Sequence, residues 1–286
     1  MGDRQFVFTM TTGRSGSAFL AELLAQNLSD AECHHEFLGW GDFGLRTPDV
    51  SHMTLFNSEG NVEKVQSFWR DKLAIILNGR TRFYVEASHM LMKAGLVENI
   101  APLTRVGHVH LIDLQRDIAA TIRSFKTRLD FFNKGNEWLW YLDKTYPRNL
   151  SGWEKFKNYG HSGLCLWYIV EVRLRAAYYA RVVAENPDVS VHRVTLEEIS
   201  TPPGAQRLLA ALGVAKVQGE VVMPPPQNVG KPLPPTGWEP GERELLPKLI
   251  AAAQFDADAL ARAAIERGLN FQPALPHIQG GFVPQP

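Results

Sequence analysis

The segment FVFTMTTGRSGSAFLAELLAQNL, residues 6–28, decides the fold of this chain. An apolar, β-prone run at residues 6–8 leads into a Gly/Ser/Arg turn, and an amphipathic helix pattern follows at once. Such a turn points successive backbone N–H groups and a helix N-terminus at one place, which makes it an anion site, most often for phosphate. Arg14 adds a positive charge there, and Ser15 and Ser17 add hydroxyl donors.

The spacing of this turn excludes one common phosphate loop. The Walker A pattern GxxxxGK[ST] is missing, because no Lys-Ser or Lys-Thr pair follows Gly16. We therefore do not expect the turn to hold the γ-phosphate of ATP. Taken alone, the segment also fits an ordinary strand-to-helix connection.

Composition limits the classes of function. The chain has 286 residues, 45% of them hydrophobic and 21% charged, which is ordinary for a globular protein. Its 30 basic and 30 acidic residues cancel, so no overall field would recruit nucleic acid or an anionic membrane. Two cysteines, Cys33 and Cys165, are too few for a disulfide framework. Any anion binding has to be local.

The N-terminus runs into the first strand without a basic region and a long apolar stretch. The longest apolar runs, such as residues 73–77, are far shorter than the ~20 residues that span a bilayer. We expect a soluble cytoplasmic protein without integral membrane contact.

Strand and helix patterns alternate along the chain, which predicts an α/β fold: a single domain with a central parallel β-sheet flanked by helices. The predicted strands are residues 6–11, 31–35, 82–86, 108–114 and 189–194. The predicted helices are residues 17–28, 61–78, 118–126, 162–186 and 203–212. We place the domain at residues 1–268 and a Pro/Gly-rich tail at residues 269–286.

Residues 128–160 interrupt this alternation with an aromatic-rich insertion. Its aromatic side chains lie among Gly, Pro and Asn, and they are Trp138, Trp140, Tyr141, Tyr146, Trp153 and Tyr159. This composition fits a cap whose aromatic residues face a ligand. It fits equally well a small hydrophobic cluster beneath a long loop.

A second candidate anion element follows the fourth predicted strand. The strand ends at Leu114, and Arg116 lies two residues after it. Ser124 lies eight residues after Arg116, two turns into the next helix. An arginine suits a phosphate because its guanidinium can donate two parallel, charge-assisted hydrogen bonds. An isolated arginine at the end of a strand is more commonly part of a surface ion pair. Arg116 therefore indicates an anion site only in combination with the turn after the first strand.

Together, these elements resemble the PAPS-dependent sulfotransferase superfamily. TGRSGSAFL, residues 12–20, resembles the loop that holds the 5′-phosphosulfate, in which Lys or Arg precedes Ser-Gly-Ser/Thr. QRDIAATIRS, residues 115–124, resembles the element that holds the 3′-phosphate with an Arg and a Ser. Residues 189–214 are similar to a late strand, acidic turn and helix of the family. The three motifs occur in family order between residues 6 and 214.

The resemblance implies a P-loop NTPase-like fold and transfer of a sulfuryl group from 3′-phosphoadenylyl sulfate (PAPS), which releases PAP and needs no metal. Ala18 stands where family members often have a second hydroxyl, and Phe19 stands where an aromatic commonly packs on adenine. The implied nucleotide-binding residues are Thr12, Gly13, Arg14, Ser15, Gly16, Ser17, Ala18, Phe19, Arg116 and Ser124.

The acceptor also needs a base, and the resemblance offers two. Glu36, in CHHEF at residues 33–37, ends the second predicted strand, where Golgi-type and many bacterial relatives have a catalytic Glu. His89 follows the third strand, where cytosolic relatives have a catalytic His. A partly desolvated carboxylate or a histidine can take a proton near neutral pH. Arg14 is the third expected catalytic residue, because it would meet the charge that develops on the leaving phosphate.

The neighbours His34, His35 and Glu36 do not indicate a metal site, because adjacent strand residues point to opposite faces. Two other functions stay open: a P-loop-type nucleotide or small-molecule kinase, and a noncatalytic nucleotide-binding module. We expect a carbohydrate, lipid or small-molecule acceptor and no nucleic-acid partner. The sequence does not indicate which acceptor is used, or the oligomeric state.

Overall fold

The computed structural model describes residues 4–131, 141–214, 220–225 and 257–266, with isolated positions between 244 and 251. Its centre is one five-stranded parallel sheet, with the strand order β2-β3-β1-β4-β5. The strands are β1 (Arg4–Thr11), β2 (Ala31–His34), β3 (Phe83–Glu86), β4 (Gly107–Gln115) and β5 (Val189–Thr195). The α/β fold and the parallel sheet are confirmed, and all five predicted strands are present.

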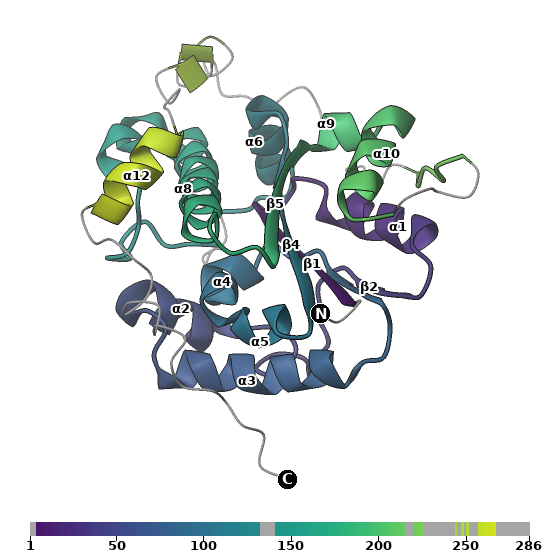
Figure 1. The fold of residues 1–286 in the computed structure, drawn as a ribbon. Coiled ribbons are helices and arrows are strands. Elements are labelled where there is room, and N and C mark those ends of the chain that lie inside the picture. The colour runs from purple at the N-terminus through teal and green to yellow at the C-terminus, as the bar shows by residue number, and fades with distance from the viewer. Residues whose placement is uncertain are drawn as a thin grey trace.

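The helices connect and cover these strands (Figure 1). The α-helices are α1 (Ser17–Asn27), α2 (Val50–Glu59), α3 (Glu63–Asn78), α4 (Leu96–Asn99), α5 (Ala101–Thr104), α6 (Ile118–Thr127), α8 (Gly160–Val182), α9 (Leu196–Ile199), α10 (Pro202–Ala211) and α12 (Ala257–Glu266). The described residues also form three short 3₁₀ helices, η1 (Leu91–Ala94), η2 (Trp153–Lys155) and η3 (Lys157–Tyr159). In the described part of the chain, no helix has the length and apolarity needed to cross a membrane.

Both faces of the sheet are buried beneath helices, and the side chains of β1 alternate between them. Phe6 and Phe8 join a large cluster with residues of α3 and α8, whereas Val7 joins a second cluster with residues of α1 and α10. Figure 1 shows α1 and α10 on one side of the sheet and α3, α4 and α8 on the other. This packing explains why the strands read as nearly continuous apolar runs in the sequence.

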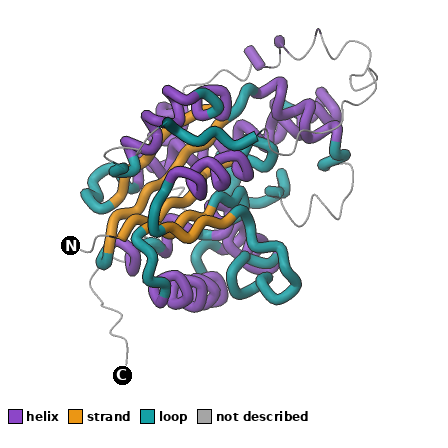
Figure 2. The backbone as a smooth tube through the Cα atoms, turned by 90° about the vertical axis from the view of Figure 1, so that its right-hand side faces the viewer, coloured by secondary structure: helices purple, strands orange, loops and turns teal. Residues whose placement is uncertain are grey.

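The strand order makes the carboxyl ends of β1 and β4 the natural binding edge. The chain leaves β1 for β2 on one side of the sheet, and β4 and β5 lie on the other, so the connections change direction beside β1. Ligands of open α/β sheets bind outside the carboxyl ends of strands at such a point. Thr11 and Leu114 are paired there, and the Thr11 hydroxyl donates to the Leu114 carbonyl at 2.6 Å. Figure 2 shows the strands, in orange, running side by side.

The described part of the aromatic insertion packs onto the main core. Tyr141 and Phe156 are buried, and Tyr146, Trp153 and Tyr159 are partly buried against the same cluster. The described aromatic side chains of residues 141–160 therefore pack in a hydrophobic cluster, and a cap that faces a ligand stays a prediction. Trp138 and Trp140 lie outside the described residues, as do the predicted tail at residues 269–286 and the end of the predicted domain at residue 268.

A group of histidines crosses the sheet on one face. His110 Nδ1 lies 2.9 Å from His192 Nε2, and His110 Nε2 lies 2.8 Å from Gln5 Oε1. The ring of His108 lies 4.8 Å from that of His110. Burial and the neighbouring histidines lower the pKa of His110 to about 3, and burial also lowers the pKa of His192. Both rings are therefore neutral in the folded protein at neutral pH.

This group predicts a loss of stability in acid. A histidine with a lowered pKa in the folded state stabilises the fold above its unfolded pKa of about 6.5, and this contribution is lost as pH falls toward the folded pKa. We expect the free energy of unfolding, measured in urea, to fall more steeply for the wild type than for His110→Gln as the pH is lowered from about 6 to 4. The difference in slope should be up to ~1.4 kcal/mol per pH unit. Parallel pH profiles for the two proteins would contradict this prediction.

Candidate functional site

The turn between β1 and α1 has an unusual backbone. Arg14 and Gly16 both have positive φ, 66° and 98°, on either side of Ser15. A Cβ on Gly16 would lie 2.6 Å from Leu196 Cδ1, at the start of α9, so this position needs glycine for its dihedral angle and has little space for a side chain. Turns with such alternating dihedrals form concave groups of N–H donors. The third motif of the resemblance thus touches the first through Leu196.

Helix α1 adds donors to the turn. Its N-cap is Gly16, and no side chain among the described residues makes a capping hydrogen bond there. The first N–H groups of a helix have no intrahelical acceptor, and here they belong to Ser17, Ala18 and Phe19. A helix N-terminus in this condition favours an anion.

The structure brings the two predicted anion elements into direct contact. Arg116 Nη1 donates to the backbone carbonyl of Arg14 at 3.0 Å, and Arg14 Nε donates to Ser124 Oγ at 2.9 Å. These pairs are 102 and 110 residues apart in sequence. The turn after β1 and the Arg…Ser element after β4 therefore form one site at the carboxyl edge of the sheet.

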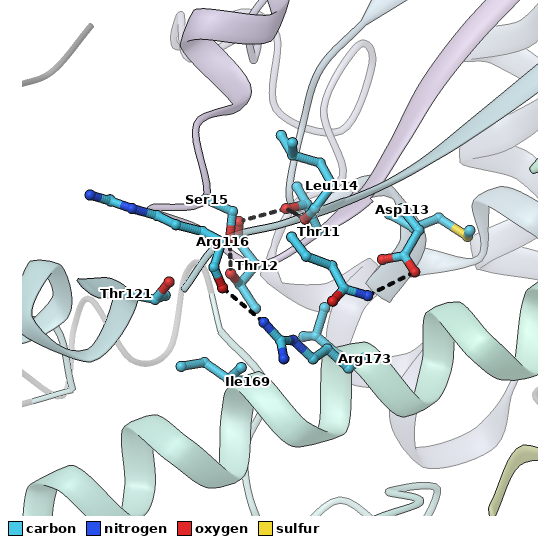
Figure 3. A pocket seen from close by; sticks show the side chains of 12 residues that line it. Thr11, Thr12, Ser15, Asp113, Leu114, Arg116, Thr121, Ile169 and Arg173 are labelled. Carbon is cyan, nitrogen blue, oxygen red and sulfur yellow. Dashed lines mark hydrogen bonds between the residues drawn. The ribbon is translucent and has the colours of Figure 1, made fainter. Parts of the chain in front are cut away.

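A small pocket lies behind the turn, between the ends of β1 and β4 and helix α8 (Figure 3). Arg173 of α8 reaches across it and donates from Nη2 to the Arg116 carbonyl at 2.8 Å. The side chain of Arg116 extends away from Arg173, out of this pocket. The pocket therefore lies behind the candidate site. The guanidinium of Arg116 lies on the opposite side, toward Arg14 and Ser124.

Positive charge accumulates at the turn. Burial lowers the pKa of Arg14, and the nearby charges of Arg128 and Arg116 lower it further, whereas Asp130 opposes the shift. Arg128, which ends α6, was not identified from the sequence because an arginine at the end of a helix is usually an ordinary C-terminal cap. Three arginines therefore lie near one turn in a chain whose net charge is zero, as a local anion site would require.

Glu36 lies close to this turn. Strand β2 ends at His34, one residue earlier than predicted, so Glu36 lies two residues beyond the strand and not at its end. Its φ is 48°, a conformation that costs a non-glycine residue roughly 1–2 kcal/mol. Its Oε1 lies 3.7 Å from His89 Nε2 and 3.9 Å from His35 Nε2. Burial raises the pKa of Glu36, although His35, the His89 backbone N–H and Lys93 act against the shift.

His89 lies between Glu36 and the turn. A Cβ on Gly13 would lie 3.7 Å from His89 Cδ2 and 3.4 Å from Tyr141 Cε1, so both rings pack directly against the turn. Burial lowers the pKa of His89 well below its ordinary value, and the charges of Lys93, His35 and Arg14 add to this effect. Both predicted bases thus lie beside the anion site, within 3.7 Å of each other.

Other predicted residues have internal partners. The hydroxyls of Thr12 and Ser15 form a short hydrogen bond with each other, and both residues are buried. Ser17 Oγ lies 3.1 Å from His35 Nε2, which links α1 to the segment that carries Glu36. Phe19 is buried in the cluster between α1 and α10, which accounts for its burial without a ligand. In the described residues, no three His, Cys, Asp or Glu side chains are grouped so as to hold a metal ion.

The sequence did not reveal two side chains beside His89. Lys93 Nζ lies 2.9 Å from His89 Nδ1 and donates to Tyr168 Oη at 2.8 Å. The Tyr168 hydroxyl also forms a hydrogen bond with the backbone of Gly13. Lys93 lies in the apolar run MLMK, and Tyr168 lies in the apolar helix α8, so neither has a local pattern that distinguishes it from the core.

Comparisons with known proteins give a similarity among solved structures. No model of a protein family matches the chain, and no curated protein is significantly similar to it. Among solved structures, the chain is similar to a sulfotransferase from Alicyclobacillus acidocaldarius. The similarity has 16% identity and a TM-score of 0.47, and it covers 92% of this chain and 96% of that chain. Two chains this different in sequence and geometry need not share an activity.

Proposed function

We propose that this protein is a sulfotransferase that moves a sulfuryl group from PAPS to a hydroxyl, or secondarily an amine, of a carbohydrate, lipid or small-molecule acceptor. The observation that carries this proposal is the direct contact of Arg14 with both Arg116 and Ser124. The turn after β1 and the element after β4 are distant in sequence, and each suits a phosphate. PAP carries two phosphates, on the 5′ and 3′ oxygens of one ribose, so it requires two adjacent anion sites.

The residues present fit this nucleotide in charge and in donor type. Arg14, the N–H groups of the turn and the start of α1 would hold the 5′-phosphate. Arg116 and Ser124 would hold the 3′-phosphate, with Arg128 adding positive charge nearby. Charge-assisted bonds to phosphate from arginine are the strongest of these. Ala18 offers only its backbone N–H, so Arg14 and the backbone would bear more of the 5′-phosphate.

The transfer step needs two things from the protein. The acceptor oxygen forms a bond to sulfur while the bond from sulfur to the 5′-phosphate oxygen breaks, and the electron pair stays on the phosphate of PAP. Arg14 and the N–H groups of the turn would stabilise that charge as it develops. The proton of the acceptor hydroxyl goes to a base, for which the largely buried carboxylate of Glu36 and the ring of His89, both beside the turn, are the candidates.

The first prediction concerns nucleotide affinity. Arg116→Ala removes a charge-assisted hydrogen-bond donor worth roughly 1.5–3 kcal/mol, so the affinity for PAP should fall about ten- to a hundredfold in titration calorimetry. Arg123→Ala is the matched control, because Arg123 is an exposed arginine of α6, the helix that follows Arg116, and it is not among the charges that shift the pKa of Arg14. The control should bind PAP like the wild type.

Mg²⁺ separates this proposal from the kinase alternative. PAP should bind the wild type equally well with and without Mg²⁺. Two results would contradict the proposal: binding of ATP that requires Mg²⁺ together with no binding of PAP, or equal losses of PAP affinity in Arg116→Ala and Arg123→Ala.

A further prediction concerns Glu36 and turnover. Glu36→Gln removes a base but keeps the size of the side chain, so kcat should fall roughly 10²- to 10⁴-fold while the affinity for PAP is retained. Glu32→Gln, which changes an exposed carboxylate on β2, should keep the wild-type rate. If Glu36→Gln loses PAP affinity as much as rate, Glu36 has a structural role and is not the base.

A further inference from the structure

Lys93 is a fully buried lysine with specific polar partners. None of its surface is exposed, and its Nζ lies 2.9 Å from His89 Nδ1 and 2.8 Å from Tyr168 Oη. Its Nζ also lies 5.1 Å from the centre of the Tyr168 ring and 5.7 Å from that of Tyr141. Because Lys is rarely buried without a partner or a role, its place beside a candidate base is informative.

A buried network holds the backbone of Lys93 in place. The Lys93 carbonyl accepts a hydrogen bond from Asn57 Nδ2 at 2.9 Å, and Asn57 Oδ1 accepts one from Arg175 Nη1 at 2.6 Å. Arg175 is paired with Glu171 at 2.7 Å, and neither side chain is exposed. These residues lie on α2, η1 and α8, so three elements fix the position from which Lys93 reaches His89.

The chemistry of these groups determines where the imidazole proton lies. When Lys93 is an ammonium it has three donors and no acceptor, so the His89 nitrogen that faces it, Nδ1, accepts its hydrogen bond. In a neutral imidazole the other nitrogen, Nε2, then carries the proton. Nε2 is the atom that lies 3.7 Å from Glu36 Oε1. A ring nitrogen that already carries a proton has no lone pair for a second one, so Nε2 in this tautomer cannot take the proton of the acceptor.

Burial lowers the pKa of Lys93 well below its usual value, and the charge of Arg175 adds to this effect. The Glu36 carboxylate acts in the opposite direction and favours the ammonium. Burial and the charges of Lys93, His35 and Arg14 disfavour a second positive charge on the His89 ring. The ring is thus held neutral between a donor on one side and a carboxylate on the other.

We propose that Lys93 is a positioning residue that holds His89 with its proton on Nε2 and facing Glu36, which leaves Glu36 as the group that takes the proton of the acceptor. The tautomer of His89 is independent of the reaction, whereas the assignment of the base rests on the proposed function. His89 then acts as a donor that orients the Glu36 carboxylate or the acceptor oxygen. The two candidate bases of the sequence have different and complementary roles.

The decisive experiment is nitrogen-15 NMR of the histidine rings in the full chain at neutral pH. His89 is one of nine histidines, and its signals are identified by their loss in His89→Gln. The wild type should show a neutral ring with its proton on Nε2 and an unprotonated Nδ1. A ring with its proton on Nδ1 would overturn the proposal, whatever the activity of the enzyme. Because this measurement uses the wild type, it does not depend on a variant that folds.

Kinetics test the same arrangement through its consequences. His89→Gln keeps a donor near the position of Nε2 but cannot act as a base, so it should retain kcat within about tenfold, the effect of one altered hydrogen bond. His89→Ala should lose substantially more. Lys93→Met should lower kcat about 10- to 100-fold, as loss of an orienting partner commonly does, with the affinity for PAP unchanged in calorimetry. If His89→Gln and His89→Ala are equally inactive, His89 is the base and the assignment to Glu36 is wrong.

These readouts separate failure of the inference from failure of the proposed function. If the protein binds no PAP, the proposed sulfotransferase activity fails, but NMR still decides the tautomer of His89. If the protein binds PAP and transfers sulfate while NMR places the proton on Nδ1, the proposed function stands and the role of Lys93 is overturned.

Discussion

The hydrogen bond from the Arg116 guanidinium to the carbonyl of Arg14 is the interaction on which the site depends. Arg14 has a left-handed backbone conformation that an L-residue rarely adopts, and the turn keeps it only if the surrounding structure compensates. Arg116 provides that support from β4, and Arg173 in turn holds the Arg116 carbonyl from α8. The result is a turn whose N–H groups and whose arginine side chain are fixed before any ligand arrives.

The same turn joins two environments of opposite character. On one side lie arginines that favour an anion. On the other lie the largely buried Glu36 and the buried His89 and Lys93, which influence one another's pKa values. Buried ionisable groups are costly unless they are paired, so the protein surrounds them with Tyr168, the Gly13 backbone and the network at Arg175. Preorganised charges of this kind are used where charge develops or a proton moves during a reaction.

Local patterns predicted the sheet and half of the site, for identifiable reasons. A parallel sheet with both faces covered produces continuous apolar strands, and Arg14 and Arg116 each follow such a strand at the same edge. Helix α2 escaped prediction because its apolar pattern is weak and its start depends on a capping box between Asp49 and His52. Lys93 and Tyr168 were not predicted as site residues, because only the tertiary packing of η1 against α8 brings them to His89. Glu36 was predicted as a strand end, but it lies in a turn beyond β2.

The most direct test of this account is a crystal structure of the complex with PAP. The account predicts the 5′-phosphate on the N–H groups of residues 12–17 with Arg14, and the 3′-phosphate on Arg116 and Ser124. It also predicts that both phosphates of PAP lie on the side of the turn that carries the arginines. An acceptor can then reach Glu36 on the other side. A nucleotide bound elsewhere, or a 3′-phosphate that contacts neither Arg116 nor Ser124, would contradict it.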